Sequence, residues 1–284
     1  MFANSVRYNV GVKNTTYIQS VHEWRQERNE TIRKENGWLA LSGLYWLNPG
    51  TNLLGSDPKS DILLPKRLPA NLGKLEYNNG IIFFQTESAQ KIKINGLETD
   101  FAILQPEPSN DPSYITIQDV RFVVIQRGDK FAVRIWDNQR EERRLFPART
   151  WFDINEEFRL PAAFTPYDRP KMSYFPGVTG EKSEFPVEGY LSFQFNNKDY
   201  QLDINKEDDG TFFIRFSDPT SKDETYPTGR YLVADEEADG KIFIDFNKAY
   251  CPPCAFTDFA TCVFAPDQNQ LDFKVTVGET YQRH

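Results

Sequence analysis

Residues 72–86 read Leu-Gly-Lys-Leu-Glu-Tyr-Asn-Asn-Gly-Ile-Ile-Phe-Phe-Gln-Thr, and this stretch indicates the fold class most directly. Two runs rich in Leu, Ile, Phe and Tyr, Leu72–Tyr77 and Ile81–Thr86, are separated by Asn78, Asn79 and Gly80. Asparagine and glycine tolerate the positive φ angles of tight hairpin turns, whereas aromatic and β-branched residues favour strands. The stretch therefore predicts a β-hairpin.

Similar apolar runs continue along the chain, and two more pairs of them are joined by short polar turns. The runs are Val120–Gln126 with Phe131–Trp136 across Arg127–Lys130, Leu191–Phe195 with Tyr200–Ile204 across Asn196–Asp199, and then Phe212–Phe216, Tyr231–Val233, Ile242–Phe246 and Phe273–Val277. Short strands without helices between them are typical of sandwiches and barrels rather than of parallel sheets. We therefore expect a mostly-β protein with a sandwich followed by a second sandwich or barrel-like module.

One helix is expected, over residues 16–36. Its apolar residues, Ile18, Val21, Trp24 and Ile32, recur at helical spacing. Thr16 can cap its start and Gly37 can end it. The remaining positions are mostly polar or charged, so we expect an amphipathic helix that packs on the β structure.

We expect a boundary between two groups of strands near Leu145–Trp151. Five prolines follow between Pro161 and Pro186, and they predict a long connection that hugs the surface. The expected organisation is an N-terminal segment (1–36), a first β module (37–148) and a C-terminal β module (149–284).

The composition excludes several classes of partner. The chain has 284 residues, of which 14% are aromatic, and its formal net charge is −8 with acidic and basic residues interleaved. A nucleic-acid binder usually presents a basic face, so neither nucleic acid nor an anionic membrane is an expected partner. Residues Met1–Tyr8 lack the pattern of a signal peptide, no run approaches the ~20 apolar residues of a membrane span, and only three cysteines are present. We expect a soluble cytoplasmic protein.

Histidine is nearly absent. The two histidines, His22 in the expected helix and His284 at the last position, offer no rigid imidazole beside a nucleophile. Ser-His-Asp and Cys-His catalysis and histidine-based metal sites are therefore not expected. No glycine-rich phosphate loop follows a strand, and no cofactor is predicted.

The three cysteines are Cys251, Cys254 and Cys262, and the first two form a C-x-x-C pair around two prolines. Such a pair can be buried structural cysteine, half of a zinc site or a redox dithiol. A zinc site needs a fourth ligand, for which Asp258 and Asp267 are the nearby acids. The structural interpretation is favoured and no metal is predicted.

A second group of polar residues extends over Asp218–Tyr231 and Asp245–Tyr250. The candidate ligand-binding or acid/base residues in it are Glu224, Tyr226, Arg230, Asp245, Asn247 and Tyr250. In one interpretation they form a structural network in which Arg230 pairs with Glu224 or Asp245. In the other they surround a mouth that holds a small polar molecule.

Four motifs resemble those of a known family. Gly37-Trp-Leu-Ala-Leu-Ser-Gly-Leu-Tyr-Trp-Leu47, Gly50-x-Asn-x-x-Gly-Ser-Asp-Pro58, Glu224-Thr-Tyr-Pro-Thr-Gly-Arg-Tyr231 and Asp245-Phe-Asn-Lys-Ala-Tyr-Cys-Pro-Pro-Cys-Ala-Phe256 are similar to the DUF1684 family of uncharacterised, mostly prokaryotic proteins. The resemblance extends from about Trp24 to Gly278 and implies no activity. It implies that Cys254 and Cys262 follow the family pattern, whereas the position of Cys251 is more often Asn.

A second resemblance concerns residues 50–100. Gly55-Ser-Asp-x-x-x-Asp-Ile-x-Leu and Ile94-Asn-Gly resemble the forkhead-associated (FHA) β-sandwich, which implies an FHA-like fold for residues 37–148. That fold binds phosphothreonine through an arginine directly after the glycine and a Ser-x-x-His. Here Ser56 stands at the arginine position and no histidine follows, so phosphopeptide binding is not expected.

Three functions stay open on the sequence, and it does not decide whether the protein is an enzyme. The first is binding of a small polar ligand or a protein partner at the C-terminal polar cluster. The second is a histidine-independent, hydrolase-like enzyme with Glu224 or Asp245 as the acid/base, Arg230 as an anion clamp and Tyr226 or Tyr250 as a proton donor. The third is a cysteine-based metal or redox site.

Overall fold

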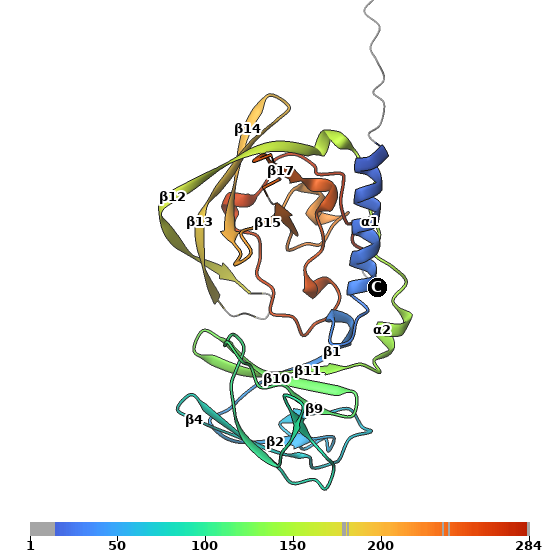
Figure 1. Cartoon of the computed structure of the whole chain (residues 1–284), viewed down its shortest axis with the longest axis vertical. Coiled ribbons are helices and arrows are strands. Elements are labelled where there is room, and N and C mark those ends of the chain that lie inside the picture. The colour runs from blue at the N-terminus through green and yellow to red at the C-terminus, as the bar shows by residue number, and fades with distance from the viewer. Residues whose placement is uncertain (1–14, 178–179, 181, 235, 238, 283–284) are drawn as a thin grey trace, which may run out of the picture.

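The computed structural model describes residues 15–177, 180, 182–234, 236–237 and 239–282. In this part of the chain a long helix lies beside β-sheets (Figure 1), and the prediction of a mostly-β fold with an N-terminal helix is confirmed. The expectations for Met1–Tyr8 and His284 lie outside the described residues. None of the helices in the described ranges has the length and apolar content that a bilayer crossing needs.

Helix α1 (Thr15–Thr31) has the predicted amphipathic face, since Val21 and Ile32 just beyond its end are buried. Two details of the prediction are wrong: Thr16 lies inside the helix, and the helix ends at Thr31. The backbone then forms turns, because Asn36 adopts a φ of 57° and the amide of Gly37 donates to Lys34 O at 3.0 Å. The sequence also did not predict the short helix α2 (Glu141–Leu145).

The N-terminal strands form two antiparallel-rich sheets. The five-stranded sheet has the order β3 (Ile62–Leu63), β2 (Gly50–Gly55), β4 (Gly73–Asn78), β5 (Ile81–Thr86) and β8 (Phe101–Leu104). The six-stranded sheet has the order β1 (Leu41–Trp46), β11 (Lys130–Asp137), β10 (Val120–Arg127), β9 (Ile115–Ile117), β6 (Lys93–Ile94) and β7 (Leu97–Glu98). The predicted hairpin is confirmed as β4–β5, with Asn79 and Gly80 at φ of 48° and 82°.

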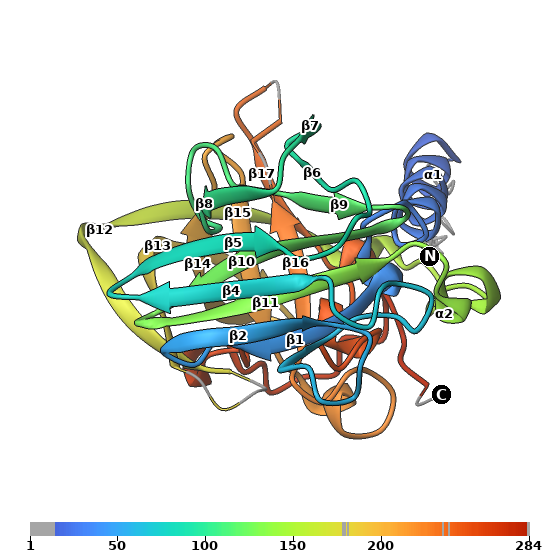
Figure 2. The same ribbon diagram turned by 90° about the horizontal axis from the view of Figure 1, so that it is seen from below.

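Strands β10 and β11 form a central layer, which explains their nearly continuous apolar sequence. On one face Phe122 and Val133 join the core of the sandwich. On the other face Val123 and Trp136 pack with Phe259, which belongs to the C-terminal part of the chain. A sheet that is covered on both faces needs apolar residues at consecutive positions. Figures 1 and 2 show this layer between the outer sheet and the C-terminal module.

The C-terminal strands form one nearly closed, barrel-like sheet. Its order is β16 (Arg230–Ala234), β15 (Phe212–Phe216), β14 (Lys198–Lys206), β13 (Lys182–Phe195), β12 (Arg159–Pro176) and β17 (Ile242–Asp245). A bridge between Glu236 and Ile242 returns the last strand toward the first. The connections include the 3₁₀ turns η1 (Trp38–Ala40), η2 (Glu156–Phe158), η3 (Pro219–Lys222), η4 (Phe246–Lys248), η5 (Pro253–Ala255) and η6 (Asp267–Asn269).

The predicted surface connection through the prolines is wrong, because these residues form β12 and β13. Pro161 and Pro166 lie within β12, and the pairing register shifts between Pro166 and Lys171. Such an irregularity accommodates residues that cannot donate a backbone hydrogen bond. The predicted strand Phe273–Val277 is also wrong, since this segment is irregular, although Val275 and Val277 are buried.

Candidate functional site

Arg230 lies at the centre of a buried network and not at the mouth of a cavity. Its side chain has no exposed surface, and its Nη2 donates to Asp218 Oδ1 at 3.1 Å and to Val275 O at 2.8 Å. Its Nη1 donates to Val277 O at 2.6 Å. These carbonyls point at the guanidinium and not at a neighbouring strand, which explains why residues 273–277 are irregular. The expected partners of Arg230, Glu224 and Asp245, are replaced by Asp218.

Asp245 and Asn247 form a second network, beneath helix α1. The Tyr17 hydroxyl donates to Asp245 Oδ1 at 2.8 Å, and Asn247 Nδ2 donates to the same carboxylate oxygen at 3.1 Å. Asn247 also donates to Asn155 O and accepts from Asn155 N, both at 2.9 Å. Burial and the neighbouring carboxylate raise the pKa of Tyr17. The network attaches the helix to the C-terminal sheet.

The remaining predicted residues lie apart from these two. Glu224 makes a surface ion pair with Lys274 at 2.8 Å. Tyr250 packs under the guanidinium of Arg28, 3.9 Å from its ring centroid. In the described part of the chain, no hydrogen bond or ion pair joins Glu224 to Asp245. None of the four cavities in this part is lined by both residues. The structure therefore distributes the predicted site over separate clusters.

Tyr226 lines a cavity of about 670 Å³ between the two halves of the chain, which we name the junction cavity. Leu39 and the region of α2 form one side, and the segment from Cys254 to Asp258, with Tyr226 and Tyr281, forms the other. The lining combines aromatic and charged groups: Phe146, Phe256, Tyr226, Tyr281, Arg140, Glu142 and Asp258. This volume and this mixture of groups are typical of small-molecule sites at the boundary between modules.

The segment 251–263, which we name the cysteine loop, holds the two halves together at this cavity. The hydroxyl of Thr257 donates to Leu41 O at 3.3 Å, and Arg127 Nε donates to Thr261 Oγ1 at 3.2 Å. Arg140 reaches Leu41 O and Glu142, and its guanidinium lies 5.8 Å from the ring centroid of Phe259. The position of the loop is therefore fixed by contacts to the first module.

Two of the cysteines meet inside this loop. The amide of Cys254 donates to Cys262 Sγ at 3.2 Å, which brings the two cysteines into contact. The pKa of the Cys254 thiol is lowered mainly by its interaction with Cys262. Burial opposes this shift, and the Tyr226 side chain adds to it. Thr228, whose buried hydroxyl has no hydrogen-bond partner among the described residues, also lowers the pKa of the Cys254 thiol. The pKa of Cys262 is raised, mainly by its hydrogen bond to Cys254.

Cys251 has a different environment. It is 2% exposed, and its amide donates to the buried carboxylate of Glu279 at 2.7 Å. Burial, followed by the charge of Glu279, raises the pKa of its thiol well above the usual range. The C-x-x-C spacing therefore does not describe the pair that the fold creates, which is Cys254 with Cys262.

This difference predicts selective alkylation. Because the thiolate is the reactive form, iodoacetamide should modify Cys254 before Cys251 and Cys262, with a pH midpoint below that of an ordinary cysteine. Peptide mass spectrometry after short exposures across a pH series measures the order and the midpoint. Equal rates at Cys251 and Cys254 would contradict the assignment.

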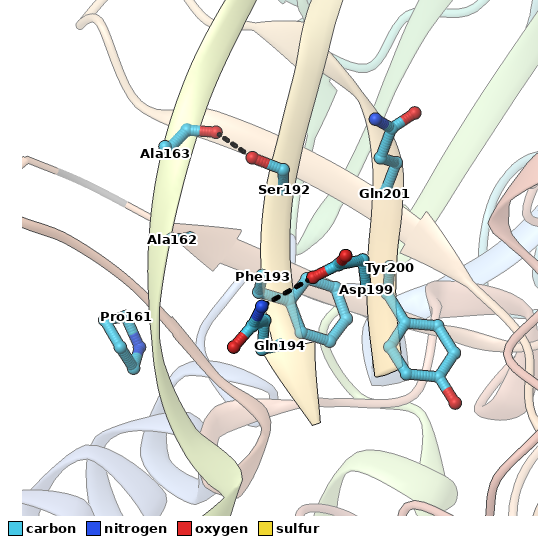
Figure 3. Close-up of a pocket in the computed structure, with 9 residues that line it drawn as sticks. All are labelled: Pro161, Ala162, Ala163, Ser192, Phe193, Gln194, Asp199, Tyr200 and Gln201. Atoms are coloured by element: carbon cyan, nitrogen blue, oxygen red, sulfur yellow. Dashed lines mark hydrogen bonds between the residues drawn. The ribbon is translucent and has the colours of Figure 1, made fainter. Parts of the chain in front are cut away.

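Another hollow of similar size is a groove of about 560 Å³ on the outer face of β12–β14, shown in Figure 3. Its polar side chains are bonded within the sheet: Ser192 Oγ donates to the backbone carbonyl of Ala163 at 3.3 Å, and Gln194 Nε2 donates to Asp199 Oδ1 at 2.8 Å. They do not converge on a common point. The junction cavity, where aromatic, charged and thiol groups gather, is the better candidate site.

Several residues that matter in the structure were missed by the sequence reasoning. Arg149 and Glu279 form an ion pair at 2.7 Å with side chains only 4% and 2% exposed, and Arg140 and Tyr281 line the cavity. Arg149 and Glu279 are 130 residues apart, so no local spacing could connect them. In the described part of the chain, no group of three or more His, Cys, Asp or Glu side chains is arranged to hold a metal ion.

Comparison with known proteins bears on the C-terminal module above all. An uncharacterized protein of Haloarcula marismortui, solved by NMR, is 29% identical over 49% of this chain and 80% of its own, with a TM-score of 0.41. An FHA domain studied for phosphothreonine-dependent interactions and the FHA domain of FhaA are each similar to 32% of this chain at 12% identity and a TM-score of 0.23, and 91% and 96% of their own chains are covered. A search of curated proteins gave no match.

Residues 144–280 match the sequence model of a family described as "Protein of unknown function (DUF1684)". The resemblance expected for the segment from Trp24 to residue 143 lies outside this match and stays a prediction. The resemblance to DUF1684 is thereby confirmed for residues 144–280, the part of the chain that carries the Glu224–Tyr231 and Asp245–Phe256 motifs.

Proposed function

We propose that the protein binds a small polar organic molecule in the junction cavity. The observation that carries this proposal is a cavity of about 670 Å³ at the boundary between the two halves, with aromatic and charged groups in one lining. Ligand sites typically occupy about 300–1,000 Å³ and combine apolar walls with a few polar groups. A protein partner is the other class that the sequence predicted, but a concave site of this size favours a small molecule.

The lining suggests the chemistry of the ligand. Phe146, Phe256 and Tyr226 offer ring faces and edges to an apolar or flat body. Arg140 is already bonded to Leu41 O and Glu142, whereas Asp258 is exposed at the cavity. The available charge is therefore negative, and it favours a neutral or cationic molecule with hydroxyl or amino groups. Three free cysteines support a location in a reducing compartment such as the cytoplasm.

A thermal-shift screen of amino acids, nucleosides, sugars and polyamines should yield a compound that raises the melting temperature. A ligand at 100 times its Kd stabilises the folded state by about 2.7 kcal/mol, which such a screen detects. Calorimetric titration of the best compound should show at least about a tenfold loss of affinity in Asp258→Asn, the equivalent of ~1.4 kcal/mol. Leu145→Trp, which adds bulk at an exposed residue of the cavity, should also weaken binding.

Asp199→Asn is the matched control, because Asp199 is an exposed aspartate in the outer groove of Figure 3. It should leave the affinity unchanged. The proposal fails if no compound in the four classes binds, or if Asp199→Asn weakens binding as much as Asp258→Asn does.

A further inference from the structure

We propose that Cys254 and Cys262 form a peroxide-reactive dithiol, in which Cys254 is the attacking thiolate and Cys262 is the resolving thiol. The proposal does not depend on which ligand, if any, the junction cavity binds. It rests on the contact of Cys262 Sγ with the Cys254 amide, on the unequal access of the two cysteines to solvent and on the polar surroundings of Cys254.

The contact between the two cysteines is direct. Cys262 Sγ accepts the Cys254 amide at 3.2 Å, so it lies against the main chain of Cys254. A disulfide requires that the thiols approach without movement of the backbone over a long distance. A sulfur that already contacts the backbone amide of the other cysteine, within one loop, meets that requirement, and both cysteines are free thiols.

Access distinguishes the two sulfurs. Cys254 is partly exposed and lines the junction cavity, whereas Cys262 is 8% exposed and does not line it. A solute that enters the cavity therefore meets Cys254 first. Cys262 lies behind it, where it can reach an oxidised Cys254 but is shielded from the solute.

The surroundings of Cys254 favour its thiolate. The pKa of the Cys254 thiol is lowered chiefly by Cys262, with further contributions from Tyr226 and Thr228, against the effect of burial. The Tyr226 hydroxyl donates to the backbone carbonyl of Cys254 at 2.9 Å and so lies close to this residue. Hydrogen bonds to the charged form of a group stabilise that form. A thiol with a lowered pKa and a second thiol beside it is the arrangement found in redox-active cysteine pairs.

The reaction needs a hydroperoxide as the oxidant. The Cys254 thiolate attacks the terminal oxygen of ROOH, the O–O bond breaks, and Cys254 sulfenic acid forms while the leaving alkoxide takes a proton to become ROH. The Cys262 thiol then attacks the sulfenic sulfur, an S–S bond forms, and the hydroxyl leaves with the Cys262 proton as water. The sum is two thiols and ROOH giving a disulfide, ROH and H₂O, in which the peroxide gains the two electrons that the sulfurs lose.

Cys251 provides a built-in comparison within the same loop. It is buried beside the carboxylate of Glu279, and its sulfur contacts Thr280 O at 3.8 Å. Nothing in these contacts favours a thiolate, and the residue does not line the junction cavity. We expect Cys251 to remain a free thiol when the other two are oxidised.

Treatment of the full chain with hydrogen peroxide or tert-butyl hydroperoxide tests this inference. Alkylation of the unfolded product should find one free thiol of three, and the unalkylated pair should be Cys254 and Cys262. Trypsin leaves all three cysteines between Lys248 and Lys274, so cleavage before Asp258 is needed to separate Cys262 from the other two. This mapping uses the unmodified protein and is unaffected by the folding of any variant.

Three serine variants assign the roles. Cys262→Ser should stop at the sulfenic acid, which dimedone traps on Cys254. Cys254→Ser should lose thiols at least about tenfold more slowly than the unmodified protein, because the remaining thiols lack the favoured thiolate. Cys251→Ser is the matched control and should react like the unmodified protein.

Three results would overturn the inference. They are three free thiols after an excess of peroxide, a disulfide that contains Cys251, and an unchanged rate of thiol loss in Cys254→Ser. Because these measurements follow the thiols alone, a failure here is distinct from a failure to find a ligand for the cavity.

Discussion

Replacing Arg230 with alanine should destabilise the protein by about 3–5 kcal/mol, because breaking a buried ion pair leaves the partner charge without compensation. The guanidinium is fully buried and meets Asp218, Val275 O and Val277 O. Its removal takes a donor from two buried carbonyls and removes the ion-pair partner of the Asp218 carboxylate, which keeps its hydrogen bonds from Thr220 and Val275 N. Urea unfolding followed by tryptophan fluorescence measures the loss as a lower unfolding midpoint, because an ordinary native stability of about 5–15 kcal/mol leaves the variant folded without urea over most of that range.

Lys274→Ala is the matched control for Arg230→Ala. Lys274 belongs to the same irregular segment, but its ion pair with Glu224 lies at the surface, where side chains are 60% and 39% exposed. Exposed pairs contribute little because water and salt screen them. The unfolding midpoint should hardly change, and comparable losses in the two variants would contradict a special role for the buried network.

Gly278→Ala should cost about 2–5 kcal/mol, which is the second large effect. Gly278 has a φ of +80°, and a Cβ atom there would lie 2.7 Å from Phe246 O and 2.8 Å from Ala249 O. The positive φ alone costs an alanine roughly 1–2 kcal/mol, and forced overpacking adds about 1–3 kcal/mol. The residue stands between Val277, which accepts from Arg230, and Glu279, which accepts from Arg149, so a shift here disturbs both buried arginines.

Gly210→Ala separates the two causes. Gly210 has nearly the same φ, +88°, but its Cβ would meet nothing within 4 Å. Only the destabilisation that the positive φ imposes on an alanine, roughly 1–2 kcal/mol, should remain. Thermal melts of both variants measure the difference, and equal losses would show that crowding at Gly278 is unimportant.

The sequence by itself determined the local structure. The stretch 72–86 encodes its own hairpin, since the turn residues and the strand residues are adjacent in the chain. The apolar stripe of α1 was predictable for the same reason, although the exact end of the helix depends on turns after Thr31. The absence of usable histidine, and the motifs that match DUF1684, are likewise properties of the chain alone.

Only the tertiary structure decided which polar groups meet. Arg230 lies 12 residues from Asp218 and 45 from Val275, and no periodicity relates residues at such distances. The local sequence around the prolines predicts an irregular connection. These prolines nevertheless lie in β12 and β13, because the sheet tolerates a register shift between Pro166 and Lys171. Local pattern cannot report such long-range compensation.

The candidate site follows the same division. The sequence identified Tyr226 and the three cysteines, because motif and spacing made them visible. It paired Cys251 with Cys254, the neighbours in the chain, whereas the fold pairs Cys254 with Cys262. It could not bring α2 and Tyr281 to that loop, since the junction cavity exists only where the two halves of the chain pack together. Spacing along the chain determines turns and faces, and packing between distant segments determines sites.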